Sequence, residues 1–309
     1  MQAVDALIRR RLDSDVVLVR TIAEHIVGGG GKRLRPAMVL LAAGACGYRG
    51  EHHLELAAVV EFIHTATLLH DDVVDESELR RGRRTANAEY GNAASVLVGD
   101  FLYSRAFQMM VGVGDLRVMR VLADATNAIA EGEVMQLVNA RNACLDQDGY
   151  FDVIQRKTAK LFEAAGRLGA LVSGAAPSLE CGLGRYGFHL GIAFQLIDDV
   201  LDYSGDVTET GKNLGDDLAE GKTTLPLIYV MRHGSAEQAA LVRRAIEGAD
   251  ASDFEAVLEA MRATGALEFV RRRAATESTQ ACKAIEALPN SNYKRCLLEL
   301  STFAVERRY

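Results

Sequence analysis

Residues 62–75 read "FIHTATLLHDDVVD", an apolar stretch that ends in three aspartates. On a helix, Asp71 and Asp75 lie on one face with Asp72 beside them. Like charges at this spacing destabilise a helix by about 0.2–0.5 kcal/mol per pair. The C-terminal end of a helix is also the unfavourable end of its dipole for acids. The stretch therefore predicts a helix whose acidic end is neutralised by a bound cation.

The same spacing returns in "FQLIDDVLD", residues 194–202, again within apolar surroundings. One such motif could be a solvated acidic helix end, but two copies in apolar context favour a metal site. Mg²⁺ prefers oxygen ligands and commonly binds one or two carboxylates together with substrate phosphates. We name the two motifs the first and the second acid cluster. The metal ligands predicted from them are Asp71, Asp72, Asp75, Asp198, Asp199 and Asp202.

Basic residues complement these acids at several separate places. "GGGGKRLRP", residues 28–36, puts Lys32, Arg33 and Arg35 after a glycine run that lets the backbone approach an anion closely. It is not a P-loop, because the GxxxxGK[ST] spacing fails. Further cations follow in "ELRRGRRT" (78–85), "RKTAK" (156–160), "TGKN" (210–213) and "EGKTT" (220–224). Two acid clusters with several cationic sites indicate two phosphorylated substrates, one bridged through metal and the other held by Lys and Arg.

The rest of the chain predicts an all-α protein. Apolar residues recur every three or four positions through residues 118–138 and 150–172, and alternating strand patterns are absent. We expect roughly ten or more helices in one domain over residues 1–309, because no Pro/Ser-rich linker divides the chain. "SAEQ" (235–238) and "SDFE" (252–255) predict capping boxes that open two later helices. Loops are predicted at 28–36, 75–92 and 204–224.

Composition excludes several classes of function. The formal charge of −7 disfavours a general nucleic-acid binder. No apolar run reaches the roughly 18 residues of a membrane span, and the N-terminus lacks a secretion signal, so a cytoplasmic location is expected. The five scattered cysteines include no CxxC pair and predict reduced thiols that are mostly buried.

The motifs together resemble the trans-isoprenyl diphosphate synthases. "GGKRLRP", "FIHTATLLHDDVVD", "LRRG", "KTA", "GIAFQLIDDVLD" and "GKNLGDDLAEGKTTLP" occur in family order between about residues 28 and 226. The resemblance is strongest to the bacterial octaprenyl diphosphate synthases, long-chain members that supply quinone side chains. It implies an all-α bundle around a central cavity, usually a homodimer, with the two acid clusters facing each other. It also implies repeated Mg²⁺-dependent condensation of isopentenyl diphosphate onto an allylic primer such as farnesyl or geranyl diphosphate, with Mn²⁺ as a possible substitute.

The resemblance also assigns residues, position by position. Besides the six aspartates as metal ligands, it implies catalytic roles for Asp71, Asp72, Asp75, Arg80, Lys157 and Lys212. Allylic-diphosphate contacts are implied for Arg80, Lys157, Thr158, Gln195 and Lys212. Isopentenyl-diphosphate contacts are implied for Lys32, Arg35, His64 and Arg81. No motif accounts for Arg307 and Arg308.

Product length is expected to depend on a tunnel beneath the first acid cluster. Family members with large aromatic residues at positions 66 and 67 make short chains, whereas Ala66 and Thr67 are small here. The growing tail should therefore pass them and Ile63 before a deeper side chain stops it. Candidates for that stop are Phe107, Met109, Met110 and Met135. The number of isoprene units and the preferred primer stay open.

Three other readings compete. His70–Asp71 is compatible with an HD-type phosphohydrolase, which would need more metal-binding histidines than the seven present. A class I terpene cyclase shares the acid motif, but this chain has no Trp and only 6% aromatic residues. A catalytically silent partner subunit should have lost aspartates, and both clusters are complete.

Overall fold

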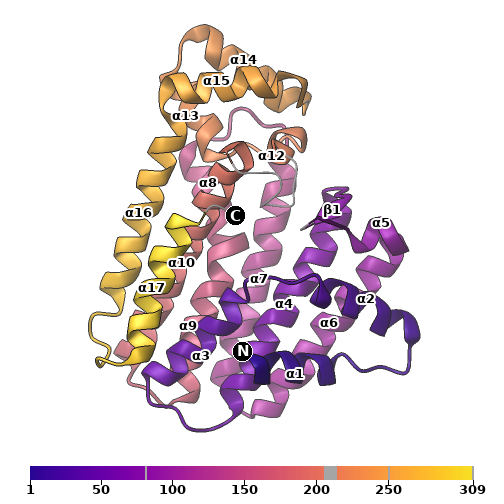
Figure 1. Cartoon of the computed structure of the whole chain (residues 1–309), viewed down its shortest axis with the longest axis vertical. Coiled ribbons are helices and arrows are strands. Elements are labelled where there is room, and N and C mark those ends of the chain that lie inside the picture. The colour runs from indigo at the N-terminus through magenta and orange to yellow at the C-terminus, as the bar shows by residue number, and fades with distance from the viewer. Residues whose placement is uncertain (81, 205–213, 250, 308–309) are drawn as a thin grey trace. The chain divides into compact units, whose positions relative to one another are not determined.

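Helices dominate the computed structural model, which describes residues 1–80, 82–204, 214–249 and 251–307 (Figure 1). The all-α prediction is confirmed, and the only strands within these ranges are a two-residue antiparallel pair. None of the helices described has both the length and the apolar content needed to cross a membrane. The chain divides into two compact units, each assembled from separate segments. The prediction of one domain stays a prediction.

The first unit comprises Met1–Thr126, Leu161–Gly187 and Ala284–Leu298. Its elements begin with α1 (Gln2–Arg11), α2 (Val17–Gly28), α3 (Leu34–Ala45), α4 (His52–Val74), β1 (Leu79–Arg80), β2 (Arg83–Arg84), α5 (Ala86–Tyr90) and α6 (Asn92–Val113). They continue with parts of α7 (Leu116–Val138), α9 (Lys160–Val172), α10 (Pro177–Ser204) and α17 (Asn292–Glu306). The predicted loop at 75–92 therefore contains a short hairpin and a one-turn helix.

Helix α4 forms the centre of this unit and packs mainly against α6 and α3. Phe62, Ile63, Ala66 and Leu69 are completely buried, so an apolar face of α4 leads directly to the first acid cluster. Removing these side chains from water stabilises the helix although its sequence ends unfavourably in acids. The position of the acids is thus set by the core beneath them.

The second unit comprises Asn127–Lys160, Phe188–Lys283 and Glu299–Tyr309. Besides parts of α7, α10 and α17, it holds α8 (Gln147–Ile154), the π-helical turn η1 (Gln155–Ala159), α12 (Asp216–Ala219) and α13 (Leu225–His233). It also holds α14 (Ala236–Gly248), η2 (Ala251–Asp253), α15 (Phe254–Thr264) and α16 (Ala266–Ala284).

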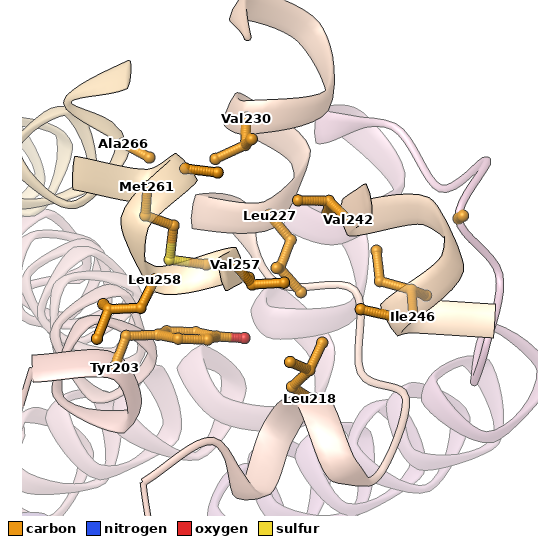
Figure 2. Close-up of a cluster of buried hydrophobic side chains, with 13 residues drawn as sticks. Tyr203, Leu218, Leu227, Val230, Val242, Ile246, Val257, Leu258, Met261 and Ala266 are labelled. Carbon is orange, nitrogen blue, oxygen red and sulfur yellow. The ribbon is translucent and has the colours of Figure 1, made fainter. Parts of the chain in front are cut away.

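An apolar cluster drawn from α10 and α12 to α16 anchors the end of α10 in this unit (Figure 2). Tyr203 is 1% exposed and stacks on Phe254, with ring centroids 6.1 Å apart. Because Tyr203 follows Asp202 directly, this packing fixes the helix end that carries the second acid cluster. A neighbouring cluster packs Tyr150, Phe151 and Ile154 of α8 against the same helix.

The two predicted capping boxes have different outcomes. Ser235 and Gln238 form a complete capping box at the start of α14. Helix α15 instead begins at Phe254 with Asp253 at the N-cap and no side-chain cap, so the box predicted at 252–255 is wrong. Ser252 lies within the preceding η2 turn and is therefore not the N-cap of α15.

Candidate active site

The first acid cluster lies at the C-terminal end of α4, as predicted, with Asp75 as its C-cap. Its members have different surroundings. Asp72 is fully buried, and its Oδ1 accepts hydrogen bonds from Arg80 Nε at 2.8 Å and Nη2 at 2.6 Å. Asp71 and Asp75 are only partly buried. Asp71 and Asp75 are therefore partly accessible to a ligand, whereas Asp72 is paired with Arg80.

Arg80 lies on β1, in the hairpin that follows α4. Burial lowers the pKa of its guanidinium, but the carboxylates of the first acid cluster outweigh this and leave the pKa above its ordinary value. Asp72 Oδ2 is buried and has no hydrogen-bond partner among the described residues. Asp72 and Arg80 line one surface pocket, together with Arg33, Arg83 and Arg84.

Two of the predicted isopentenyl-diphosphate residues lie together in the first unit. Arg35 Nη1 is 3.2 Å from His64 Nε2, and the Arg35 guanidinium lies 4.3 Å from the centre of the Phe162 ring. Arginine can only donate, so Nε2 accepts and the His64 ring carries its proton on Nδ1. The face of the Phe162 ring attracts the Arg35 guanidinium through a cation–π interaction. Lys32, the third of these residues, is exposed in the loop before α3.

Arg33, between these cations in sequence, has a structural role that the sequence does not reveal. It takes a left-handed backbone conformation, with φ of 49°, at the N-cap of α3. Its guanidinium is paired with the buried Glu61 and donates to Val27 O at 3.0 Å. Of the three cations in "GGGGKRLRP", this one stabilises the loop.

In the second unit, Asp199 lies in a buried hydrogen-bond network. It is 2% exposed, accepts from Tyr150 Oη at 2.5 Å and from Gln195 Nε2 at 2.8 Å. Thr158 Oγ1 in turn donates to Gln195 Oε1 at 2.9 Å. Three residues assigned from the motifs, namely Thr158, Gln195 and Asp199, are thus joined in one network. No sequence motif pointed to the fourth member, Tyr150.

Burial sets the protonation of this network. It raises the pKa of the Asp199 carboxyl well above its ordinary range, and the nearby Asp217 carboxylate adds to the rise. Burial, followed by the charge of Asp199, also raises the pKa of Tyr150 well above its ordinary value. The phenol therefore keeps its proton and acts as the donor.

Arg307, which no motif explained, contacts the second acid cluster. Its side chain is 3% exposed, and its Nη2 donates to Phe194 O at 2.8 Å and lies 3.2 Å from Asp198 Oδ1. Its guanidinium stacks 3.9 Å from the centre of the Phe194 ring. A residue from the C-terminal end thus neutralises Asp198, and only the folded chain could have shown this.

Lys157 and Thr158 lie in η1, a turn with the wider π-helical hydrogen-bond pattern. Lys157 Nζ forms an ion pair with Glu133 Oε2 at 2.5 Å. Such single turns are rare in proteins and occur frequently at functional sites. This turn is a structural feature that apolar periodicity cannot predict.

The residues present fit a divalent cation that is also bound by substrate. In both acid clusters the second aspartate is buried and hydrogen-bonded, while the first and third, at helical i, i+4 spacing, are partly buried or exposed. Asp198 is in addition paired with Arg307. No group of three His, Cys, Asp or Glu in the described part of the chain forms a complete metal cage. Mg²⁺ commonly takes only one or two carboxylates and completes its shell with phosphate and water. The pairs Asp71/Asp75 and Asp198/Asp202 suit that mode better than Asp72 or Asp199.

The predicted tunnel residues have different environments. Ile63 and Ala66 are completely buried and Thr67 is partly buried on α4, while Met135 is partly buried on α7. Phe107 is 40% exposed, and its ring lies against Tyr103 at the surface of the first unit. This exposure is a physical reason against its closing a tunnel within one chain. Met109 and Met110 of the same helix are buried.

Two predicted site residues, Arg81 and Lys212, lie outside the described residues. The cysteine prediction needs a correction, because Cys144 and Cys181 are exposed and Cys46, Cys282 and Cys296 are partly exposed. All five are free thiols, as predicted, but none is fully buried. Cys46 and Cys144 lie in turns outside the helices.

Comparison with known proteins agrees with this arrangement. A model of the polyprenyl synthetase family matches residues 16–264. The octaprenyl diphosphate synthase of Escherichia coli K12 is 53% identical over 308 residues, which cover 99% of this chain and 95% of that protein. The corresponding enzyme of Haemophilus influenzae is 52% identical over 310 residues, covering 100% and 94%.

A solved structure shows the same fold. The polyprenyl synthase from Caulobacter crescentus, complexed with calcium and isoprenyl diphosphate, has a TM-score of 0.97 and 45% identity, covering 100% of this chain and 95% of that one. The family match, the identities over the whole length and the shared fold agree with one another. The chain therefore belongs to the polyprenyl synthetase family.

Proposed function

We propose that this chain is an octaprenyl diphosphate synthase that condenses isopentenyl diphosphate repeatedly onto an allylic primer. As a member of its family it is a prenyltransferase that makes long-chain trans-polyprenyl diphosphates. The octaprenyl product is supported by the relatives at 52–53% identity. The observation that carries the proposal is the buried network that joins Thr158, Gln195 and Asp199 beside Lys157.

We assign the allylic diphosphate to cations and to the polar side chains beside Lys157. Lys157, Thr158 and Gln195 bind the allylic diphosphate, with Arg80 and Lys212 as further cations. As the carbon–oxygen bond breaks, negative charge grows on the leaving diphosphate, and these fixed cations stabilise it more than they stabilise the ground state. A divalent cation, on which the family depends, withdraws further charge from that leaving group when bound. We assign divalent-cation binding to Asp71 and Asp75 in the first cluster and to Asp198 and Asp202 in the second, with Mg²⁺ as the physiological ion and Mn²⁺ as a substitute.

The second substrate is held without metal. Lys32, Arg35, His64 and Arg81 bind isopentenyl diphosphate and orient its double bond toward the allylic carbon. The double bond attacks that carbon, and the new cation loses a proton to the released diphosphate. No strong side-chain base is needed, which fits a site built from cations, amides and carboxylates.

A homodimer is proposed as the assembly. Helix α6 presents Val96, Leu97, Phe107 and Val111 on one exposed face, with exposed fractions between 37% and 66%. Exposed apolar residues aligned along a helix commonly mark an interface. The cytoplasmic location expected from the sequence stays a prediction.

The test is a direct assay of the purified protein with farnesyl diphosphate, labelled isopentenyl diphosphate and Mg²⁺. The expected result is a labelled product that, after dephosphorylation, runs with octaprenol on reversed-phase chromatography. Parallel reactions with geranyl diphosphate, with Mn²⁺ and with EDTA identify the primer and the metal. Phosphate release without elongation would indicate a hydrolase, a cyclic hydrocarbon a cyclase, and activity only with a second protein a silent subunit.

A further inference from the structure

Helix α7 contacts the π-helical turn η1 through three consecutive residues, Glu131, Gly132 and Glu133. Glu131 Oε2 accepts from Arg156 Nη1 at 2.9 Å, and Glu133 Oε2 accepts from Lys157 Nζ at 2.5 Å. Gly132 lies between them against the backbone of the turn. We call residues 131–133 the η1 support.

Gly132 is the residue that permits this contact. A Cβ atom at this position would lie 2.6 Å from Lys157 N and 3.0 Å from Lys157 Cα. Both are backbone atoms, so the turn itself would have to move. Glycine within a 23-residue helix is otherwise unfavourable. The close approach to Lys157 gives a physical reason for its presence in α7.

The two glutamates differ in what they contribute. The Glu131–Arg156 pair is about half exposed on both sides, and such pairs contribute little to stability. The Glu133–Lys157 pair is more enclosed, with side chains 28% and 20% exposed. An ammonium group has three N–H donors. Glu133 accepts from one of them, and this contact fixes the position of Nζ.

The turn is held on a second side as well. Thr158, the next residue of η1, donates to Gln195 of α10. Lys157 is thus fixed from α7 and Thr158 from α10, and both contacts depend on where the π-helical turn lies. A displacement of η1 would move both side chains at once.

We propose that the η1 support positions the allylic-diphosphate site, with Gly132 setting the place of the turn and Glu133 aiming the Lys157 ammonium. This inference rests on the proposed function, in which Lys157 and Thr158 bind the allylic diphosphate. Gly132 and Glu133 are positioning residues, since they act through Lys157 and Thr158.

The first test compares Gly132→Ala with Gly112→Ala. Gly112 lies near the end of α6, where an added Cβ meets nothing within 4 Å. Because a displacement of about 1 Å can cost about 100-fold in rate, Gly132→Ala should lower kcat/KM for farnesyl diphosphate by about 100-fold. The KM for isopentenyl diphosphate should stay unchanged, and Gly112→Ala should behave like the wild type.

The second test separates charge, hydrogen bonding and plain stability at Glu133. Losing a hydrogen bond to a charged group costs about tenfold or more, so Glu133→Ala should lower kcat/KM for farnesyl diphosphate by at least that factor. Glu133→Gln keeps an acceptor for Lys157 and should restore most of the loss. Asp124→Asn, at an exposed position of the same helix, is the control. If Glu133 had only a structural role, Glu133→Ala and Glu133→Gln would both lower the amount of active protein and leave the KM for farnesyl diphosphate unchanged.

A third measurement is independent of turnover. Amide hydrogen exchange over residues 155–159 should be faster in Gly132→Ala than in Gly112→Ala and the wild type. If the wild type elongates farnesyl diphosphate and Gly132→Ala keeps the wild-type KM and exchange, the positioning role is overturned and the proposed function stands. If the wild type neither binds nor elongates the primer, the proposed function fails and the positioning role fails with it, whatever the exchange shows.

Discussion

Asp71 and Asp72 are adjacent in sequence but differ in surroundings, which predicts different consequences of their loss. Asp71→Asn removes a partly accessible carboxylate and should lower turnover by about 100-fold or more with little change in unfolding free energy. Asp72→Asn leaves Arg80 without its buried partner and should lower the unfolding free energy by about 3 kcal/mol. Urea unfolding and steady-state assays of both variants give the two numbers.

The pair of measurements is its own control, because both changes remove one carboxylate from the same cluster. Equal stability of the two variants would contradict the inner position of Asp72. Near-normal turnover of Asp71→Asn would contradict its assignment as a metal ligand.

The hydroxyl group of Tyr150 is a second place where the loss of one atom should have a measurable effect. Tyr150→Phe removes the donor to Asp199 Oδ2 and should lower the unfolding free energy by about 1–3 kcal/mol. Because Asp199 also binds Gln195, the KM for farnesyl diphosphate should rise. Tyr293→Phe, at a position 43% exposed, is the matched control and should leave both values unchanged. A wild-type KM in Tyr150→Phe would show that the network does not reach the substrate.

For single residues, the sequence predicted which side chains could bind metal or diphosphate, but not how deeply each is buried or which residues contact it. Spacing alone marked all six aspartates, and it could not separate the buried Asp72 and Asp199 from their neighbours. That separation depends on Arg80, Tyr150 and Gln195, which approach from other elements. Arg307 was missed for the same reason, since its partner Asp198 is 109 residues away.

Among the secondary-structure elements, those with regular apolar periodicity were predicted and irregular ones were not. The long helices α4, α7 and α10 follow their three- and four-residue apolar spacing. The π-helical turn η1 and the β1–β2 hairpin were not predicted, because no apolar pattern in the sequence marks them. The cap of α14 was predicted from local sequence, whereas the start of α15 was set by the preceding turn.

The contact between α9 and α10 predicts a packing effect at one glycine. A Cβ at Gly187 would overlap the backbone carbonyl of Phe162. Gly187→Ala should therefore lower the unfolding free energy by about 1–3 kcal/mol, the usual cost of overpacking. Gly112→Ala in open space should instead be neutral or stabilise by up to about 1 kcal/mol. If urea unfolding showed Gly112→Ala to be destabilised like Gly187→Ala, close packing at Gly187 would not explain the loss of stability.

For the whole molecule, the sequence motifs were sufficient to identify the family, and the match over residues 16–264 confirmed it. Product length is a finer property, and the position of Ala66 makes it testable. Ala66 is completely buried on α4, about one helical turn before the first acid cluster. In the proposed tunnel the larger side chain of Ala66→Phe should block the growing tail and shorten the product, as measured by chromatography of the dephosphorylated prenols. An unchanged octaprenyl product would place the tunnel elsewhere; Val17→Phe, at an exposed site, is the control.

The proposed homodimer would cover the exposed apolar face of α6. Leu97 and Val111 are 66% and 59% exposed on that face. A two-fold interface would bring the same patch of both copies together. Each substitution would therefore place two like charges, one from each copy, in the buried interface. The double variant Leu97→Glu, Val111→Glu should therefore sediment as a monomer at micromolar concentration while keeping its helical circular dichroism. Val17→Glu, 65% exposed on α2, is matched in exposure and should leave the dimer intact. A dimer that survives the double variant, or one that Val17→Glu dissociates equally, would place the interface away from α6.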